Sequence, residues 1–358
     1  MSVLLEPMIS PPRVSVVLSV FNGEAFLAES IESLLVQSFR DFELIVIDDG
    51  STDRTSEILH GFDDPRVRTL RNRSNLGLTP SLNRGLSEAR GEFIARQDAD
   101  DVSEPDRLQR QLDFFHRNPE VVLAGSWYKE IDESGREIQE VQLPSDPLGL
   151  RWALLFYCPF AHSSVMWRKS PVQDFVGGYD ERLDYATDHE FWNRIAARFP
   201  VSNVKRPLLR YRVGLPSMSA HPAMHRETMM IRTGLLADLM GWSEGSKDYE
   251  RTEALFRRLF DLLYSDAMLP SPDLVQEGTA ELETLHRAFA RRLDLTSGEE
   301  RAHLNGLKRA IAQRLIRHAR IVRSEGRPDP ASKFFREGIR MDPGSALTVR
   351  ALRYFLRL

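Results

Sequence analysis

Short apolar segments alternate with segments of helical periodicity over the first hundred residues of the chain. Residues 14–20 form an apolar, β-branched run that is long enough for a buried strand and too short for most helices. Apolar residues at near-helical spacing follow as far as Leu35, and the same order repeats up to a strand at 92–96. This alternation predicts an α/β fold in which a mostly parallel sheet carries helices on both faces.

The pattern changes twice further along the chain. Between residues 105 and 213 helical and strand-like segments are mixed, with a short strand expected at 163–167. Beyond about residue 223 the strand signals stop, so we predict an α/β domain over residues 1–225 and an α-helical domain over residues 226–358. Residues 331–343 resemble half of a tetratricopeptide-type helical repeat, although a single copy does not make an array.

Polar residues follow three of the predicted strands, at Ser19–Asn22, Asp48–Ser51 and Asp98–Asp101. Ligands of such sheets bind outside the carboxyl ends of the strands, so these segments predict a binding site. The Asp-Gly-Ser-Thr composition also suits a turn and a helix start. We therefore expect Ser51 or Thr52 to cap the helix that follows, while Asp49 binds a ligand.

Asp98 and Asp100 are the first candidates for metal binding. Two carboxylates one residue apart at a strand end can converge on a divalent cation that also holds a nucleotide. Hard cations such as Mg²⁺ and Mn²⁺ prefer oxygen ligands and retain water and phosphate oxygens. Acidic triplets are also common in solvated turns, and the position after an apolar strand favours the metal site here.

Composition narrows the class of protein. The chain has 358 residues, of which 42% are hydrophobic and 28% charged, the balance of a globular protein. No run approaches the ~20 apolar residues of a membrane span, and residues 1–12 lack the features of a signal peptide, so we expect a cytoplasmic protein. The single cysteine, Cys158, excludes an internal disulfide framework and a thiolate zinc site.

The net charge of −4 conceals an asymmetry. Residues 301–358 contain 14 Lys and Arg against 4 Asp and Glu, whereas the other 300 residues contain 34 against 48. A basic C-terminal region is either a solvated helical face or a surface that contacts something anionic. We favour a peripheral contact with the inner face of the cytoplasmic membrane, where lipid-linked acceptors reside, and expect no nucleic-acid partner.

Three segments together resemble the family 2 glycosyltransferases: residues 14–55, residues 75–101 with the sequence QDADD, and residues 177–196 with GGYDERLDYATDHEFW. They occur in the order found in that family and cover roughly residues 14–213. The resemblance implies the GT-A fold, a nucleotide-sugar donor linked to UDP, GDP or dTDP, and inversion of the anomeric centre. It also implies a divalent metal, Mn²⁺ or Mg²⁺.

The resemblance assigns roles to single residues. Asp100 is expected as the principal metal ligand, with Asp98 between the metal and the ribose and His221 completing the metal shell. Arg84 or Arg96 is a candidate diphosphate contact, because Leu82 stands where a related subgroup has Arg. The residues expected to contact the nucleotide-sugar are Ser19, Phe21, Asn22, Asp49, Asp98 and Arg84.

Asp188 matches the catalytic base of the family. An inverting transfer needs a carboxylate that deprotonates the attacking hydroxyl, and Asp188 shares a helix face with apolar residues, so it is predicted to point toward the cleft floor. The alternative is an N-cap of this helix. Asp180, Asp184 and Glu190 are fallback bases, and the residues expected on the acceptor side are His162 and Asp180.

Departures from the family pattern limit the expected activity. Thr187 stands where many relatives have Glu, and no Gln-x-x-Arg-Trp motif follows Asp188, which argues against a processive synthase. We therefore expect transfer of one sugar per encounter, to a carbohydrate or lipid-linked hydroxyl, in surface polysaccharide or glycolipid synthesis. The loop 216–222 is a candidate lid. The alternatives are a phosphatase of the Asp-x-Asp type and a nucleotide-binding scaffold or adaptor without transferase activity.

Overall fold

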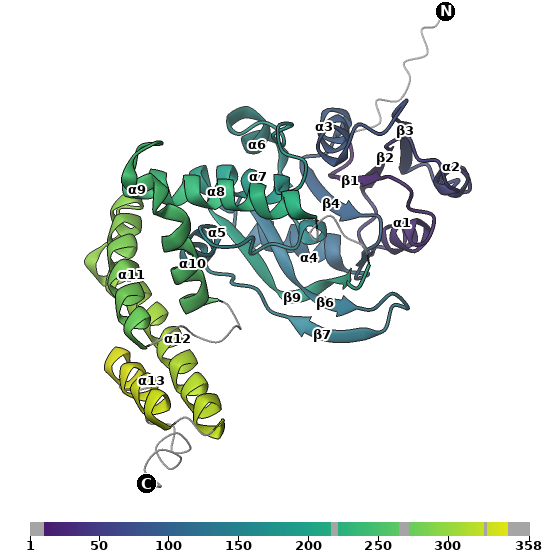
Figure 1. Ribbon diagram of the computed structural model, residues 1–358. Coiled ribbons are helices and arrows are strands. Elements are labelled where there is room, and N and C mark those ends of the chain that lie inside the picture. Colours follow the sequence, from purple (N-terminus) through teal and green to yellow (C-terminus); the bar gives the residue numbers. More distant parts are fainter. Residues whose placement is uncertain (1–10, 216–220, 265–271, 326–327, 343–358) are drawn as a thin grey trace, which may run out of the picture. The chain divides into compact units, whose positions relative to one another are not determined.

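The computed structural model describes residues 11–215, 221–264, 272–325 and 328–342. The chain divides into two compact units, Met1–Thr228 and Met229–Leu358 (Figure 1). The expected domain boundary, after residue 225, lies three residues before this division. All strands of the described residues belong to the first unit.

The first half of unit 1 is built on four parallel strands. All residues of the strand that contains Leu18 are buried, so both of its faces are covered, as the continuous apolar run predicts. The sheet order is β3-β2-β1-β4, so the chain winds outward from β1 in both directions. The strands are β1 (Val14–Val20), β2 (Phe42–Asp48), β3 (Val67–Arg71) and β4 (Phe93–Asp98), and the helices between them are α1 (Leu27–Leu35), α2 (Thr55–His60) and α3 (Leu78–Glu88).

The second half extends the sheet in the order β4-β8-β6-β9-β5, with β7 paired to β6. Strand β8 is antiparallel to both β4 and β6, which makes the sheet mixed. The strands are β5 (Val102–Ser103), β6 (Leu123–Ile131), β7 (Glu137–Val141), β8 (Met166–Arg168) and β9 (Val201–Arg212). The helices are α4 (Arg107–Arg117), α5 (Pro147–Leu154), α6 (Lys169–Phe175) and α7 (Thr187–Arg198).

Two apolar clusters pack the helices onto the two faces of the sheet. One joins β1 and β2 to Ile31 of α1, Leu59 of α2 and Phe115 of α4. The other joins the opposite face to α3, α5 and α6, and to Trp192 of α7. Gly85 allows the close approach of α3, because a Cβ there would lie 2.5 Å from Cγ1 of Val17. The result is the three-layer arrangement that the alternating pattern predicted.

Two local predictions were wrong. Helix α2 begins at Thr55 and not near Ser51, because the Asp53 carboxylate accepts hydrogen bonds from the backbone nitrogen and hydroxyl of Thr55. The expected strand at 163–167 begins later, since His162–Ser164 forms a 3₁₀ helix before β8. Both errors arise where a short polar segment can satisfy its own backbone locally.

The second unit is helical, as the loss of strand signals predicted. The capping box between Thr296 and Glu299 fixes the start of the long helix α12. Gly338 lies close to this helix, because its Cβ would be 3.0 Å from Cγ1 of Ile316. The helices are α8 (Pro222–Met240, across the division), α9 (Lys247–Glu250), α10 (Thr252–Leu263), α11 (Pro272–Arg292), α12 (Ser297–Ser324) and α13 (Pro328–Met341).

None of the helices in the described part of the chain combines the length and apolar character that crossing a bilayer requires. The half-repeat expected at 331–343 falls on α13, and its last residue lies outside the described residues.

Candidate active site at the acidic strand ends

A cleft of about 440 Å³ opens where β4 ends. Its polar side contains the acidic residues that follow β4, and the start of α7 supplies another carboxylate. Aromatic side chains from β6 and β9 line it as well. The cleft residues used below are Asp98, Asp100, Asp101, Tyr128, Cys158, His162, Tyr185, Asp188 and Tyr211.

Both carboxylate oxygens of Asp98 have partners in the protein. Arg96 donates to Oδ1, and the Ser163 hydroxyl donates to Oδ2 at 2.6 Å. The Ser163 oxygen also accepts from the backbone nitrogen of Asp98 at 2.9 Å. Burial alone would raise the pKa of Asp98, but the Arg96 charge and the Ser163 hydrogen bond lower it below its usual value. Asp98 is therefore a carboxylate held in one orientation.

Asp100 and Asp101 carry the opposite shift. Burial and the Asp98 charge raise the pKa of Asp100 to about 6. Burial and the charges of both neighbours also raise the pKa of Asp101 well above its usual value. These three carboxylates repel one another in a partly water-excluded site, so a divalent cation would stabilise the ionised loop. The donor set, all oxygen, fits Mg²⁺ or Mn²⁺.

Arg212, at the end of β9, holds this acidic loop in place. Its backbone nitrogen donates to Oδ1 of Asp101 at 2.9 Å, and its Nε donates to the backbone oxygen of Asp100 at 2.9 Å. The same guanidinium binds Glu29 of α1 at 2.6 Å and the backbone oxygens of Asp132 and Glu133. Its side chain is only 1% exposed.

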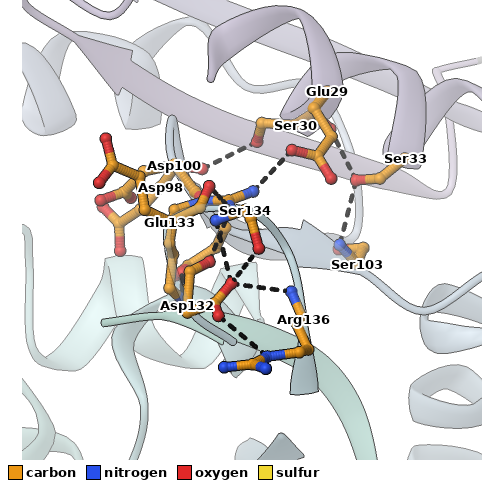
Figure 2. Close-up of polar contacts among 12 residues, drawn as sticks. Glu29, Ser30, Ser33, Asp98, Asp100, Ser103, Asp132, Glu133, Ser134 and Arg136 are labelled. Carbon is orange, nitrogen blue, oxygen red and sulfur yellow. Dashed lines mark hydrogen bonds and ion pairs between the residues drawn. The ribbon is translucent and has the colours of Figure 1, made fainter. Parts of the chain in front are cut away.

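Figure 2 shows the consequence of these bonds. Glu29, the Asp98–Asp100 loop and the Asp132–Ser134 turn gather at one place, although they are far apart in the sequence. The Asp132 carboxylate orders its own turn by accepting from Ser134 and Arg136. One buried arginine thus joins α1, the acidic loop and the β6–β7 hairpin.

Asp188 lies in the first turn of α7 and opens onto the cleft. It is not an N-cap: the cap position is Ala186, and the Asp188 Oδ1 accepts from its neighbour His189 at 2.7 Å. The Cys158 thiol lies 3.7 Å from Oδ2. Burial raises the pKa of Asp188 to about 6, which suits a general base that works near neutral pH.

The segment before α7 is fixed by Glu227. Its carboxylate accepts hydrogen bonds from the backbone nitrogens of Tyr185 and Ala186, each at 2.9 Å. It also accepts from the nitrogen of Asp184 at 3.2 Å. A negatively charged side chain at a helix N-terminus is favourable, so Glu227 helps to orient the helix that carries Asp188.

His162 lines the cleft, as its expected acceptor-side role requires. Its Nε2 lies 3.0 Å from the Tyr179 hydroxyl, and its ring meets Trp192 edge to face. Burial and the Arg96 charge lower the pKa of His162 to about 3. The ring is therefore neutral at physiological pH, and contact with an acceptor stays a prediction.

The residues expected to hold the donor lie at the ends of β1 and β2. Phe21 is 47% exposed, whereas Ser19 is buried. Asn22 has a left-handed backbone, and its side-chain oxygen accepts from the nitrogen of Thr52 at 2.9 Å, which ties the two strand ends together. Ser51 accepts from the nitrogen of Asn22. Donor contacts by these residues stay predictions.

Asp49 and Arg84 both make hydrogen bonds to the loop between β3 and α3. Asp49 is 2% exposed, and its carboxylate accepts from the backbone nitrogens of Leu76 and Gly77 and from the side chain of Asn72. Arg84 donates to the oxygens of Asn72 and Arg71, and it does not line the cleft. Both order the loop between β3 and α3, and donor contacts by Asp49 and Arg84 stay predictions.

Two of the other expected residues lie outside the cleft. Asp180 is bound by Arg182, and this ion pair lowers the pKa of Asp180 to about 2, so neither an acceptor contact nor a fallback base is supported. His221 stacks on Tyr185 with ring centroids 4.5 Å apart, and its Nδ1 accepts from the nitrogen of Ala223.

Other expectations about the site also change. Within the described residues, no three His, Cys, Asp or Glu side chains are grouped as a metal centre would need, and a metal contact by His221 stays a prediction. Glu190 is paired with Arg194. The candidate lid falls on residues 216–220, which lie outside the described residues, and on Pro222, which begins α8.

Several residues of the site were not identified from the sequence. Ser163 and Arg212 lie 65 and 111 residues from the aspartates that they bind. Isolated serines and arginines carry no pattern of their own. Tyr128 and Tyr211 carried no motif, since each is a single tyrosine within a strand.

Comparison with known proteins agrees with this geometry. The model of glycosyl transferase family 2 matches residues 15–172. A glycosyltransferase of Haemophilus influenzae described as uncharacterized is 30% identical over 212 residues, which are 56% of this chain and 66% of that protein, just under two thirds. The amylovoran biosynthesis glycosyltransferase AmsE of Erwinia amylovora is 32% identical over 56% of this chain and 76% of AmsE.

Among solved structures, that of S. aureus TarS residues 1–349 in complex with UDP-GlcNAc has a TM-score of 0.56 at 17% identity, covering 93% of this chain and 92% of that one. The mixed sheet, the acidic cleft and this similarity define a GT-A glycosyltransferase fold, as predicted. The chain belongs to glycosyltransferase family 2.

We predict that Arg212→Met destabilises unit 1 by about 3 kcal/mol, because Glu29 and three backbone carbonyls would lose a buried charged partner. Urea unfolding followed by tryptophan fluorescence measures the change. Arg210→Met is the matched control on the same strand: its nearest acid, Glu104, is 3.8 Å away, so we expect a loss below about 1 kcal/mol. Equal losses of unfolding free energy for the two variants would contradict the role of Arg212 in holding the acidic loop.

Proposed function

We propose that this protein transfers a single sugar from a nucleotide-sugar donor to a hydroxyl of a carbohydrate or lipid-linked acceptor, with inversion of the anomeric centre. One observation carries the proposal: the acidic loop Asp98–Asp101 and the Asp188 carboxylate open onto the same cleft. TarS, which shares the fold, was solved with UDP-GlcNAc, and this supports a nucleotide-sugar donor. The AmsE relative, named for amylovoran biosynthesis, supports a role in surface polysaccharide or glycolipid synthesis.

The reaction follows from the position of the base. Asp188 takes the proton of the acceptor hydroxyl as its oxygen attacks the anomeric carbon. The new bond forms on the face opposite the leaving group, so the bond to the nucleoside diphosphate breaks with inversion. The raised pKa of Asp188, about 6, gives a carboxylate that is ionised at pH 7 and basic enough to accept this proton.

Asp100 and Asp98 are the residues that would hold a divalent cation, Mn²⁺ or Mg²⁺. Asp98 already binds Arg96 and Ser163, so we expect Asp100 to supply the principal ligand. When bound, the cation offsets the diphosphate charge and stabilises the leaving group. Arg212 binds the backbone oxygen of Asp100 and the carboxylate of Asp101. It therefore fixes the loop that runs from the two expected ligands to strand β5.

Donor and metal should stabilise the folded chain together. With UDP-, GDP- and dTDP-sugars tested at about 100 times Kd in the presence of Mn²⁺, we expect one donor class to raise stability by about 2.7 kcal/mol. The readout is a thermal-shift panel with and without the metal. Asp100→Asn should abolish the metal-dependent part of the shift. Asp180→Asn, an acid outside the cleft, should keep it.

A panel in which no donor raises the melting temperature would contradict the proposed transferase. It would favour the alternative of an adaptor without transferase activity, since that function needs neither donor turnover nor the cleft carboxylates.

The pH dependence of transfer should report Asp188. The base works in its ionised form, so kcat/KM should fall about tenfold per pH unit below about pH 6 and level off above it. Asp188→Asn should lower kcat by about 10²–10⁴-fold without a change in donor-induced stabilisation. Glu190→Gln is the control on the same helix, because Glu190 is paired with Arg194 outside the cleft. The pKa of Asp100 is also about 6, so the profiles are measured at saturating Mn²⁺, where the cation favours ionised Asp100; an unchanged acid limb in Asp188→Asn would then contradict the assignment.

The basic second unit supports a further proposal, a peripheral contact with the anionic inner face of the cytoplasmic membrane. Helices α12 and α13 expose Arg317, Lys333 and Arg336 to solvent. Each basic side chain near an anionic surface contributes about 1 kcal/mol, an attraction that salt screens. Such a contact would bring the enzyme to lipid-linked acceptors.

Co-sedimentation with vesicles tests the membrane contact. We expect binding to phosphatidylserine-containing vesicles, loss of binding at high salt and no binding to phosphatidylcholine alone. The double change Arg317→Glu and Lys333→Glu should weaken binding by at least about tenfold. Arg54→Glu with Arg136→Glu, also exposed but in the first unit, is the charge-matched control. Binding that ignores salt and lipid charge would refute the contact.

A further inference from the structure

Two tyrosines of the cleft form a pair that the proposed chemistry leaves unused. Tyr128 lies on β6 and Tyr211 on the neighbouring strand β9, with ring centroids 5.4 Å apart and ring planes at 58°. Both are half-buried and line the cleft that also contains Asp188. They therefore offer two adjoining aromatic surfaces on the wall of the cleft.

The sheet register places this pair beside the acidic loop. Strand β5 pairs with β9 in antiparallel fashion, with Val102 opposite Arg210, so Tyr211 neighbours the loop that ends at Asp101. Consistent with this, burial and the charges of Asp101, Asp98 and Asp100 raise the pKa of Tyr211. Burial and the Glu130 charge raise the pKa of Tyr128 to about 12, so both phenols keep their protons.

The order of the strands separates the tyrosines from the expected nucleotide contacts. The expected nucleotide contacts lie at the end of β1: Ser19 is within the strand, and Phe21 and Asn22 come directly after it. The tyrosines lie on β6 and β9, and strands β4 and β8 separate the two groups in the sheet. The acidic loop follows β4. A donor that spans from the β1 end to that loop leaves the tyrosine side of the cleft for a second substrate.

The chemistry of the pair fits a sugar ring. The C–H face of a pyranose packs on aromatic rings, and its hydroxyls need hydrogen-bond partners. Both phenol groups can donate and accept hydrogen bonds, and both tyrosines line the cleft. Leu143 adds apolar surface to the same cleft.

We propose that Tyr128 and Tyr211 form an acceptor subsite that binds the pyranose ring carrying the attacking hydroxyl. The inference rests on the proposed transferase function and extends it, since it assigns the acceptor to carbohydrates. A sugar stacked on this pair lies in the cleft that holds Asp188, the base that must reach its hydroxyl. Neither tyrosine touches the reacting atoms, so both are binding residues.

Kinetics with defined acceptors test the subsite. The probes are methyl pyranosides of glucose, galactose, mannose and N-acetylglucosamine, used with the donor and metal found in the thermal-shift panel. We expect Tyr128→Ala and Tyr211→Ala each to raise the acceptor KM by about tenfold, a factor equivalent to about 1.4 kcal/mol. The donor KM should stay within about twofold. Tyr211→Phe should recover most of the loss, because it restores the ring.

Two further variants make the outcome specific. Phe175→Ala removes an aromatic ring that is 65% exposed and outside the cleft, and should leave both KM values unchanged. Phe21→Ala should raise the donor KM and not the acceptor KM. Thermal melting without ligand, together with the donor-induced shift, confirms that each tyrosine variant is folded.

The outcomes separate this inference from the proposed function. A wild-type chain that no donor stabilises would overturn the transferase itself. A wild-type chain that binds donor but glycosylates none of the pyranosides would overturn only the subsite. So would tyrosine variants that raise the donor KM, or that behave like Phe175→Ala.

Discussion

The structure of the site depends on the concentration of negative charge at the end of β4. Asp98, Asp100 and Asp101 lie within four residues in a largely buried loop, where like charges repel strongly because little water screens them. Arg96 and Arg212, both buried, oppose this repulsion from two sides. They leave Asp98 ionised and Asp100 with a raised pKa, so the loop is folded but not fully neutralised. A divalent cation bound together with a diphosphate would interact with this remaining negative charge of the loop.

The same constraint organises parts of unit 1 that lie far apart in the sequence. To reach the acidic loop, Arg212 must lie at the end of β9, and its other hydrogen bonds then fix Glu29 on α1 and the turn after β6. Strands β6 and β9 run parallel beside each other, so their tyrosines come together on the cleft wall. The helix that carries Asp188 has its own support, because Glu227 binds the backbone just before it. Asp188 and the acidic loop are thus positioned by separate contacts.

These contacts explain which features could be predicted from the sequence. Asp98 and Asp100 were expected at a strand end because an apolar run precedes them, and Asp188 was expected as the base from the family resemblance and from its place at the start of an amphipathic helix. The structure confirms these positions, and the roles stay predictions. Asp180 and His221 lie outside the cleft, the first bound by Arg182 and the second stacked on Tyr185, and the motif-based assignment did not take these contacts into account. Arg212 and Ser163 were missed because their partners are distant in the chain. Local periodicity predicts elements, whereas buried polar networks depend on tertiary packing.

The family match ends at residue 172, before several residues of the candidate site. The match covers residues 15–172, which include β1 to β4, the acidic loop and Tyr128, but end before Asp188, Tyr211 and Arg212. Family membership therefore speaks most directly for the part of the site that would hold the donor. Asp188, the proposed base, and Tyr211 lie in the following segment, where the case rests on geometry: side chains from α7 and β9 line the same cleft as the acidic loop. The proposed donor side thus lies within the family match, whereas the proposed acceptor side depends on how this chain continues after β8.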